Sequence, residues 1–558
     1  MSDPDGDVLS CTLDTDGDGT SEYTIEDCGA TTLQTHAYAA TGSYAPILSV
    51  SDGRSENVQA NASVTVDEPN APPVLSGIDD QRTIRGNAIE IPFSVSDENP
   101  SGVTVTGVSD DPTLVADADI EILASGADRT LRITPAPFGT GGVTITLTAL
   151  DEGGLEDTQA FMLEVAEPFQ TTPAKLTASD GADNDRFGSS VAIDGDYAII
   201  GAEKDDLTGL NEGSAYAFKR SGDSWVEIDK LTASDAATGD RFGHSVAVDG
   251  DYAIIGASSD DLTGEDEGSA YAFKRNGDTW VEIDKLTASD AAYRDAFGWS
   301  VAIDGEYAII GASKDDLTGN NEGSAYAFTR NGDSWAEVDK LTASDAADDD
   351  LFGNSVAIDG DYAIIGALRD DLTGAEEGSA YAFTRNGDSW AEVDKLTASD
   401  AADNDFFGNS VAIEGDYAII GASSDDLTGN NEGSAYAFKR NGDSWAEVDK
   451  LTASDAADYD LFGNSVAIDG NYAIIGARRD DLTGADEGSA YAFTRSGDSW
   501  AEVDKLTASD AADGDRFGWS VAIEGDYAII GAYIDDLLNT NEGSAYNTNE
   551  GSAYVFMK

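Results

Sequence analysis

The chain has 558 residues, and its 31 Lys and Arg against 108 Asp and Glu give a formal net charge of −77. Such a charge repels nucleic acid and anionic lipid, so neither is an expected partner. Membrane insertion is excluded too, because no apolar run reaches the ~18 residues of a spanning helix. Disorder is excluded because 40% of residues are hydrophobic and they recur in strand-like runs. The acidic excess keeps two interpretations open, a solvated salt-adapted surface and sites for cations.

The first segment, residues 1–68, contains both cysteines, Cys11 and Cys28. Their place in one small module favours a disulfide and an oxidising compartment, with two unpaired buried thiols as the alternative. The opening residues form no signal peptide, and the chain starts inside a module. We therefore expect a fragment of a longer protein that is secreted or held on a cell surface.

An acidic turn follows the first cysteine. It has the pattern D-x-D-G-D-G-x-x-E, formed by Asp14, Asp16, Asp18 and Glu22. Hard oxygen ligands on alternate residues, with Gly at the sharp turn, suit Ca²⁺. The EF-hand spacing fails at its twelfth position, Ile25, so a plain hairpin turn with solvated acids remains the alternative.

A second segment, residues 71–167, follows an Asn-Ala-Pro-Pro linker at 70–73. Its β-branched and alternating runs predict an immunoglobulin-like sandwich. The expected strands are 88–95, 103–108, 130–134, 142–149 and 160–165. Tandem sandwiches of this kind are typical spacers.

The remaining chain, residues 172–558, repeats every 55 residues. The string Lys-Leu-Thr-Ala-Ser begins at positions 175, 230, 285, 340, 395, 450 and 505. Four antiparallel strands joined by short Asp-Gly or Asn-Gly turns, at a period near 50 residues, predict a β-propeller blade. In the unit 395–449 these strands are expected at 408–413, 417–422, 434–438 and 445–451.

The number of strands predicts a seven-bladed ring closed by its own chain ends. First, second and third strands occur seven times, but the Trp-x-Glu fourth strand occurs only six times. The unpartnered segment 173–179 is expected to complete the last blade, which removes two exposed sheet edges. In that blade the string 539–546 is repeated at 547–554, so one copy should form the third strand and the other should bulge out.

The repeat resembles the FG-GAP repeat, with Phe-Gly at 407–408 and Gly-Ala at 421–422, thirteen residues on. That repeat builds the propeller of integrin alpha chains and of many bacterial surface proteins, so the resemblance implies a seven-bladed propeller for extracellular binding or adhesion. Integrin-type blades carry a calcium loop where this chain has short links such as 194–196, which are too short to wrap a cation. The two leading segments resemble a PKD module and an Ig-like or cadherin-like module.

Each unit has two acidic loops, one before Phe-Gly and one after Gly-Ala. Because neighbouring strands run antiparallel, both loops emerge on one face of the ring, which we call the upper face. Adjacent loops that present five or six carboxylates could hold a cation such as Ca²⁺, with solvated charge as the alternative. The candidate ligands in one unit are Asp400, Asp403, Asp405, Asp425, Asp426 and Glu432, with equivalents in the other units.

The near-identical units differ most around Phe-Gly and after Gly-Ala, on the upper face. Drift alone should change both faces alike, so this variation predicts a recognition surface on the loops. The candidate binding residues are Arg186, Glu203, Lys204, His244, Trp299, Leu351, Leu368, Arg369, Phe406, Arg478, Arg479, Trp519 and Tyr533.

Patterns of a catalytic centre are missing from the sequence. The two histidines, His36 and His244, lie near no recognisable nucleophile pattern, and the glycines follow turns rather than a phosphate loop. We therefore expect a non-enzymatic module that binds a protein or a glycan, with Ca²⁺ as the one candidate cofactor. A structural protein of a matrix or cell envelope is the alternative, and a propeller-type polysaccharide-active enzyme is the third hypothesis.

Overall fold

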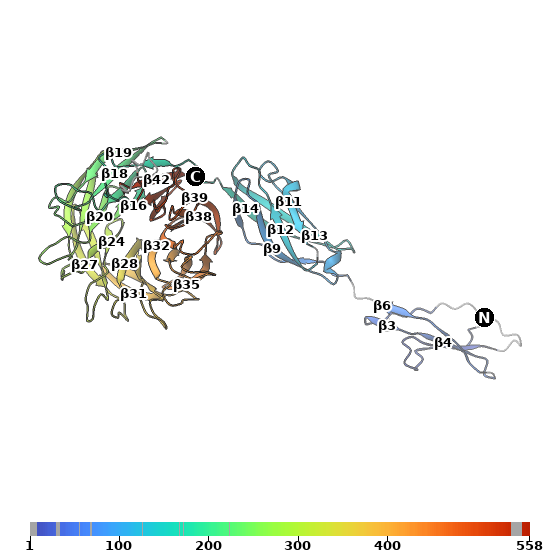
Figure 1. Ribbon diagram of the computed structural model, residues 1–558. Helices are drawn as coiled ribbons and strands as arrows, with labels where there is room; N and C mark the ends of the chain where they lie inside the picture. Colours follow the sequence, from blue (N-terminus) through green and yellow to red (C-terminus); the bar gives the residue numbers. More distant parts are fainter. Residues whose placement is uncertain are drawn as a thin grey trace.

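The computed structural model describes residues 8–28, 34–54, 56–66, 70–124, 126–166, 168–170, 172–222, 224–536 and 549–558. Over these residues the chain is all-β apart from two 3-10 turns, Pro100–Gly102 and Asp117–Asp119. No helix in this described part has the length and apolarity needed to cross a membrane. Figure 1 shows two small β units in blue and cyan, followed by a ring of sheets coloured from green to red.

The first unit contains a four-stranded antiparallel sheet, in the order β2-β1-β4-β5, and a two-stranded sheet of β3 and β6. A disulfide joins Cys11 on β1 to Cys28, so it ties the strand before the acidic turn to the chain after it. The strands are β1 (Ser10–Asp14), β2 (Tyr23–Ile25), β3 (Gly42–Tyr44), β4 (Ile47–Ser51), β5 (Val58–Asn61) and β6 (Val64–Val66).

The second unit has two four-stranded sheets, β10-β13-β14-β8 and β11-β12-β9-β7, around one apolar core. The five longest strands overlap the five predicted ones. The other three have two to four residues, too few to show an alternating pattern. The strands are β7 (Val74–Leu75), β8 (Gln81–Ile84), β9 (Ile89–Ser96), β10 (Thr104–Ser109), β11 (Ile120–Leu123), β12 (Asp128–Ile133), β13 (Gly141–Leu150) and β14 (Glu156–Ala166).

The ring consists of seven four-stranded antiparallel sheets, which confirms the predicted all-β propeller architecture (Figure 1). The first strands, which line the axis, are β16 (Phe187–Asp194), β20 (Phe242–Asp249), β24 (Phe297–Asp304), β28 (Phe352–Asp359), β32 (Phe407–Glu414), β36 (Phe462–Asp469) and β40 (Ser520–Glu524). The second strands are β17 (Tyr197–Ala202), β21 (Tyr252–Ala257), β25 (Tyr307–Ala312), β29 (Tyr362–Ala367), β33 (Tyr417–Ala422), β37 (Tyr472–Ala477) and β41 (Tyr527–Ala532).

The outer half of each blade is formed by the third and fourth strands. The third strands are β18 (Ser214–Ser221), β22 (Ser269–Asn276), β26 (Ser324–Asn331), β30 (Ser379–Asn386), β34 (Ser434–Asn441), β38 (Ser489–Ser496) and β42 (Ser552–Met557). The fourth strands are β19 (Ser224–Leu231), β23 (Thr279–Leu286), β27 (Ser334–Leu341), β31 (Ser389–Leu396), β35 (Ser444–Leu451), β39 (Ser499–Leu506) and, in the last blade, β15 (Ala174–Leu176).

The last sheet joins the two ends of the repeat region. Its order is β15-β42-β41-β40, so β15 stands where the other blades have a fourth strand of their own. Lys175 lies opposite Tyr554, as Lys230 lies opposite Tyr216 in the first blade. The third strand, β42, uses the second copy of the duplicated string, and the first copy, 539–546, lies outside the described residues.

Glycines let neighbouring blades approach backbone to backbone. Gly243 has a φ of +87°, and a Cβ on it would lie 2.2 Å from the carbonyl oxygen of Ser214 in the preceding blade. A Cβ on Gly201 would lie 2.1 Å from the carbonyl oxygen of Gly243. Any side chain at these positions would force the blades apart, which explains the Gly of Phe-Gly and the Gly of Gly-Ala together.

The apolar core of the propeller lies between neighbouring blades. Phe242 is fully buried, and its ring centre lies 5.4 Å from that of Tyr271 in the same blade. It shares one cluster with Ile199 and Ala215 of the preceding blade. Each blade therefore needs its neighbour to bury its apolar face, as in other repeat folds.

The second unit contacts the propeller at the lower end of the sixth blade. Arg82 on β8 donates a hydrogen bond of 2.6 Å to the Tyr472 hydroxyl, and its guanidinium carbon lies 4.4 Å from the Tyr472 ring centre. Ser496, at the end of β38, donates a hydrogen bond to the backbone carbonyl of Asp80. Tyr472 and Ser496 both border the short hairpins, so this contact lies on the face opposite the upper face.

Candidate functional site

A β-bulge follows Phe-Gly in six of the seven first strands. In the first blade Phe187 pairs with Ala202 while Ser190 pairs with Gly201, so Gly188 and Ser189 are extra residues. A similar shift recurs in five other blades. A bulge redirects the side chain of the extra residue. Here the residue after Phe-Gly is turned toward the axis of the ring.

These redirected residues meet in one pocket of about 240 Å³ on the upper face. Every blade contributes the residue after Phe-Gly, and two blades add the residue after Gly-Ala. The pocket is smaller than the ~300–1,000 Å³ typical of small-molecule sites, so it fits one terminal group of a larger ligand. Its lining residues are Ser189, Glu203, His244, Trp299, Asn354, Asn409, Asn464, Arg478 and Trp519.

One half of the pocket is a row of carboxamides from the fourth, fifth and sixth blades. Asn354 Nδ2 donates a 3.0 Å hydrogen bond to the backbone carbonyl oxygen of Asn409. Asn409 Nδ2 donates one of 2.9 Å to the backbone carbonyl oxygen of Asn464. Asn464 Nδ2 donates to the carbonyl oxygen of Trp519 at 3.0 Å. These bonds fix the amides and leave each Oδ1 and one N–H per amide for a ligand.

The other half begins with stacked cations and rings on the sixth, seventh and first blades. The guanidinium carbon of Arg478 lies 4.6 Å from the Trp519 ring centre. Trp519 packs against Tyr533 of the same blade, with ring centres 4.1 Å apart. The guanidinium carbon of Arg186, from the first blade, lies 5.3 Å from the centre of the Tyr533 ring. Cation–π contacts of this kind hold the two rings in place.

Glu203 is the charged centre of the next part of the wall. It is 7% exposed, accepts a 3.0 Å hydrogen bond from Arg186, and lies 2.8 Å from His244 Nδ1. Burial opposes its charge, but His244 and Arg186 outweigh burial and hold the pKa of Glu203 at about 2. The His244 ring packs against Trp299, with ring centres 4.6 Å apart. Glu203 is therefore a carboxylate whose charge is already matched within the wall.

Arg478 is the lining cation whose charge is not matched in this way. Its Nε is buried and has no hydrogen-bond partner within the described residues, and no ion pair there includes it. Burial, with repulsion from the neighbouring Arg479, lowers the pKa of Arg478 to about 10. The guanidinium is thus still charged at neutral pH and can receive an anion.

The pocket brings together five of the thirteen predicted binding residues: Glu203, His244, Trp299, Arg478 and Trp519. Arg186 and Tyr533 support this lining from behind. The remaining six lie on the upper face outside the lining: Lys204, Leu351, Leu368, Arg369, Phe406 and Arg479. The sequence-based candidates do not include the three asparagines and Ser189, although they share the position after Phe-Gly with His244, Trp299 and Trp519.

The comparison with known families adds to this geometry. A family model described as "FG-GAP repeat" matches residues 171–218, 225–273, 280–328, 335–383, 390–438, 445–493 and 500–556. The chain belongs to the FG-GAP repeat family. Each match runs from the outer strand of one blade through the first three strands of the next, so the seven matches together cover the ring and the predicted resemblance is confirmed for the propeller.

No curated protein matches this FG-GAP chain. Among solved structures, an I-band fragment of titin shares 12% identity over 48% of this chain and 83% of its own, with a TM-score of 0.21. The SrpA adhesin from Streptococcus sanguinis shares 16% over 30% of this chain and 94% of its own, with a TM-score of 0.16. Domains 4 and 5 of the S-layer protein SbsC share 17% over 28% of this chain and 70% of their own, with a TM-score of 0.15. These structural similarities are too weak to indicate a function.

In the FG-GAP blades a lysine lies between two of the predicted metal ligands. The Lys450 ammonium is 2.7 Å from both Asp400 and Asp425. Tyr436 also donates a 2.8 Å hydrogen bond to Asp400. The lysine that opens each Lys-Leu-Thr-Ala-Ser string makes the same pair of contacts in the other blades, with Lys175 serving the last blade. The cation between these carboxylates is part of the chain.

The other four predicted ligands have separate surroundings. Asp405 is 2% exposed, and burial raises its pKa to about 7. Glu432 is buried and accepts hydrogen bonds from backbone N–H groups of its own loop. Asp403 and Asp426 are exposed and each accepts one backbone N–H. Calcium binding by the upper loops stays a prediction, since these acids are spread over the loops rather than gathered at one point.

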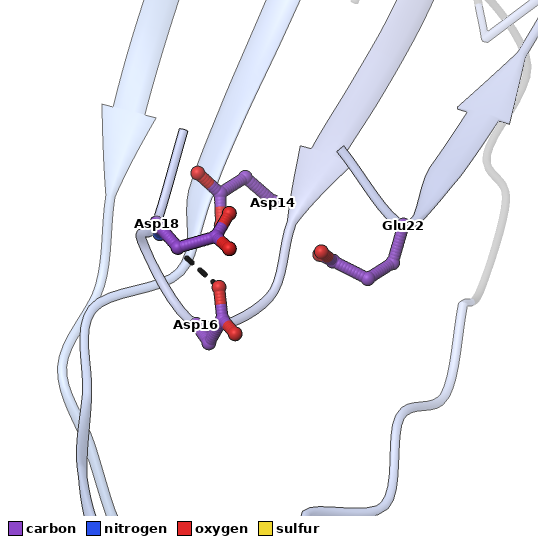
Figure 2. A group of neighbouring side chains, drawn as sticks. All are labelled: Asp14, Asp16, Asp18 and Glu22. Carbon is purple, nitrogen blue, oxygen red and sulfur yellow. Dashed lines mark hydrogen bonds between the residues drawn. The ribbon is translucent and has the colours of Figure 1, made fainter. Parts of the chain in front are cut away.

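The acidic turn of the first unit is different. Asp14, Asp16, Asp18 and Glu22 each offer an oxygen within 4.8 Å of the others, the one group of this kind among the described residues. Figure 2 shows the three aspartates around the inside of the turn and Glu22 facing them from the start of β2. Gly17 and Gly19 both have positive φ and donate backbone hydrogen bonds to Asp14. This acidic cluster could hold a metal ion.

Proposed function

We propose that this FG-GAP protein is a secreted or cell-surface binding module whose propeller recognises a protein or glycan through the axial pocket. The observation that carries the proposal is the pocket itself. It is the place where seven nearly identical blades present four different residue types, Ser, His, Trp and Asn, at one structural position. The second strand, in contrast, has the sequence Tyr-Ala-Ile-Ile-Gly-Ala in every blade.

The attachment of the second unit supports the same role. Strand β37 begins at Tyr472, which contacts Arg82, and ends one residue before Arg478, which lines the pocket. Six residues of strand separate the two by about 20 Å, at ~3.3 Å per residue. The neighbouring unit therefore holds the propeller by its lower face and leaves the upper face to a ligand.

The test of this role is binding by the full chain to an array of glycans and extracellular proteins. The comparison variant replaces Trp299 and Trp519 with Asn, the residue that occupies the same position in three other blades. Because Asn is native to this position, the fold should survive, which unfolding curves check. We expect the array signal to disappear in the variant. An unchanged pattern of bound spots would contradict recognition through the pocket.

A polysaccharide-active enzyme is the second candidate, and one observation favours it. His244 and Glu203 lie 2.8 Å apart beside Trp299, which is a geometry that acid–base chemistry uses. The binding role is preferred because Glu203 is buried and its contacts with Arg186 and His244 keep it ionised. Release of new reducing or unsaturated sugar ends from array-positive polysaccharides, lost in His244→Asn, would reverse this preference.

We also propose that the acidic cluster of the first unit binds Ca²⁺. Four carboxylates with two glycines in the turn suit a hard cation of that size. Titration of the full chain with Ca²⁺ by calorimetry tests the proposal, with Asp16→Asn and Asp18→Asn together as the variant. We expect one site that is lost in the variant. Equal heats in both proteins would show that the ion binds elsewhere.

A further inference from the structure

The basic residues that differ between blades lie on the upper face of a chain whose net charge is −77. Most basic residues of the propeller occupy repeated positions, in the Lys-Leu-Thr-Ala-Ser strings and the third strands. Apart from these and Lys558, every one lies in the loops of the upper face: Arg186, Lys204, Arg241, Arg294, Lys314, Arg369, Arg478, Arg479 and Arg516. Both acidic loops of every unit lie on this same face, so its carboxylates still outnumber these cations, and an anion must be received by a single cation that no carboxylate matches.

Arg478 is a cation of this kind. Its guanidinium lies against Trp519 on one side and lines the pocket, and within the described residues no carboxylate pairs with it. A planar guanidinium held on an aromatic ring presents a fork of N–H donors that matches a carboxylate. Glu203, in the same pocket, is already paired with Arg186 and His244, so it does not compete for Arg478.

The remaining walls suit a sugar better than a peptide side chain. Trp299 and Trp519 are both partly exposed and line the pocket. Trp519 already packs against Arg478 and Tyr533, and Trp299 packs against His244 and Lys314, so the uncovered part of each ring meets the C–H groups of a pyranose. The row of Asn354, Asn409 and Asn464 offers Oδ1 acceptors for hydroxyl protons. An acidic side chain has the carboxylate but neither a ring face nor hydroxyl groups to use these walls.

We propose that the axial pocket binds the terminal residue of an acidic glycan, a sugar ring that carries a carboxylate. Arg478 receives the carboxylate, the tryptophans flank the ring, and the asparagines accept its hydroxyl protons. The inference rests on the proposed binding role and adds the chemical class of the ligand.

The experiment measures binding of the full chain to four probes by calorimetry and tryptophan fluorescence, at fixed ionic strength. The probes are a uronic-acid trisaccharide, a sialic-acid-terminated trisaccharide, a neutral galactose trisaccharide and a tri-glutamate peptide. We expect at least one acidic sugar to bind at least tenfold more tightly than the neutral sugar and the peptide. The acidic sugar that binds more tightly shows whether the natural ligand carries a uronic acid or a sialic acid.

Variants drawn from sister blades keep the fold while changing the pocket. Arg478→Ser installs the residue found at this position in three other blades, Ser258, Ser313 and Ser423. Arg479→Ser is the matched control, since it removes an equal charge one residue away, outside the lining. We expect Arg478→Ser to weaken acidic-sugar binding at least tenfold and Arg479→Ser to change it less than threefold.

The outcomes separate this inference from the proposed function. Equal loss in both arginine variants would reduce the effect to general charge and overturn the carboxylate assignment. Tighter binding of tri-glutamate or of the neutral sugar would overturn the ligand class while leaving a pocket that binds. If no probe binds and the array also shows no signal that depends on Trp299 and Trp519, the proposed function fails as well.

Discussion

At the scale of single residues, the feature repeated in all seven blades is a lysine ammonium held between two aspartates. Burial opposes the charge of Lys450, but hydrogen bonds from it to Asp400 and Asp425 outweigh burial and raise its pKa. Asp425 is buried and Asp400 is half-exposed, so the pair lies at the boundary of the interior. In this strongly acidic chain the lysine therefore lies between two carboxylates, Asp400 and Asp425, that would otherwise repel each other.

Replacing Lys450 with Met tests this account. The change leaves Asp425 buried without its cation, which we expect to lower the free energy of unfolding by about 2 kcal/mol. The control is Lys439→Met, because Lys439 and its partner Asp498 are both largely exposed and such pairs contribute ~1 kcal/mol at most. Urea unfolding curves measure both changes. Similar small losses in the two variants would show that the internal lysine contributes little.

The buried aspartates equivalent to Asp405 predict a dependence of stability on pH. Burial raises the pKa of each, to about 6 or about 7, above the ~3.9 of an unfolded Asp. Between these values the folded chain keeps a proton that the unfolded chain has lost, so their contribution is present at low pH and disappears as pH rises through 7. Carboxylates with lowered pKa, such as Asp400, act in the opposite direction in more acidic solution.

Asp405→Asn isolates one of these groups. The amide keeps an oxygen to accept the N–H of Ala402 and cannot ionise. We expect the stability of the variant relative to the parent to be higher at pH 8 than at pH 5. Urea unfolding at constant ionic strength measures this difference. A stability difference that is the same at both pH values would contradict a raised pKa at Asp405.

At the scale of elements, the three-residue strand β15 supplies the outer strand of the last blade. Leu176 is buried in the cluster between the last and first blades. We expect Leu176→Ala to cost about 3 kcal/mol, as for other buried leucines, and to match Leu286→Ala at the equivalent position of the second blade. Urea unfolding measures both. A much smaller loss for Leu176 would mean that β15 frays independently of the ring.

The strands themselves could be predicted from the sequence, because a 55-residue period repeats each turn and apolar run seven times. The bulge could not, since the sequence Phe-Gly-Asn-Ser looks like an ordinary alternating strand until its pairing partner is known. The direction of the residue after Phe-Gly depends on that bulge. Sequence variation therefore pointed to Trp299 and His244, but not to Asn409 in the same pocket. The role of Lys450 was missed because its partners lie 25 and 50 residues away.

At the scale of the whole molecule, the contact between Arg82 and Tyr472 joins the second unit to the propeller. Phe169, in the connection, packs against the same tyrosine with ring centres 6.3 Å apart. Both contacts leave the upper face uncovered. The orientation of the pocket relative to the second unit thus depends on a few side chains around the Tyr472 ring.

Arg82→Gln should loosen this joint without unfolding either part. We expect small-angle scattering of the full chain to show a larger range of maximum dimensions, because the cation–π contact and hydrogen bond to Tyr472 are both lost. Arg132→Gln, which removes an exposed arginine paired with Glu90, is the control. Identical scattering from all three proteins would place the rigidity of the joint elsewhere, for example in Phe169.

The glycine contacts between blades have a consequence for evolution. Every junction repeats the same backbone approach, including the one between the last blade and the first, where Gly188 faces Ser552 as Gly243 faces Ser214. The core therefore carries little information about blade order, and the residues that tell one blade from another lie mainly around the axis and in the upper loops. Exchange or shuffling of whole repeats can then rewrite the pocket in a single step, so a lineage of such chains can diversify its specificity while its scaffold stays constant.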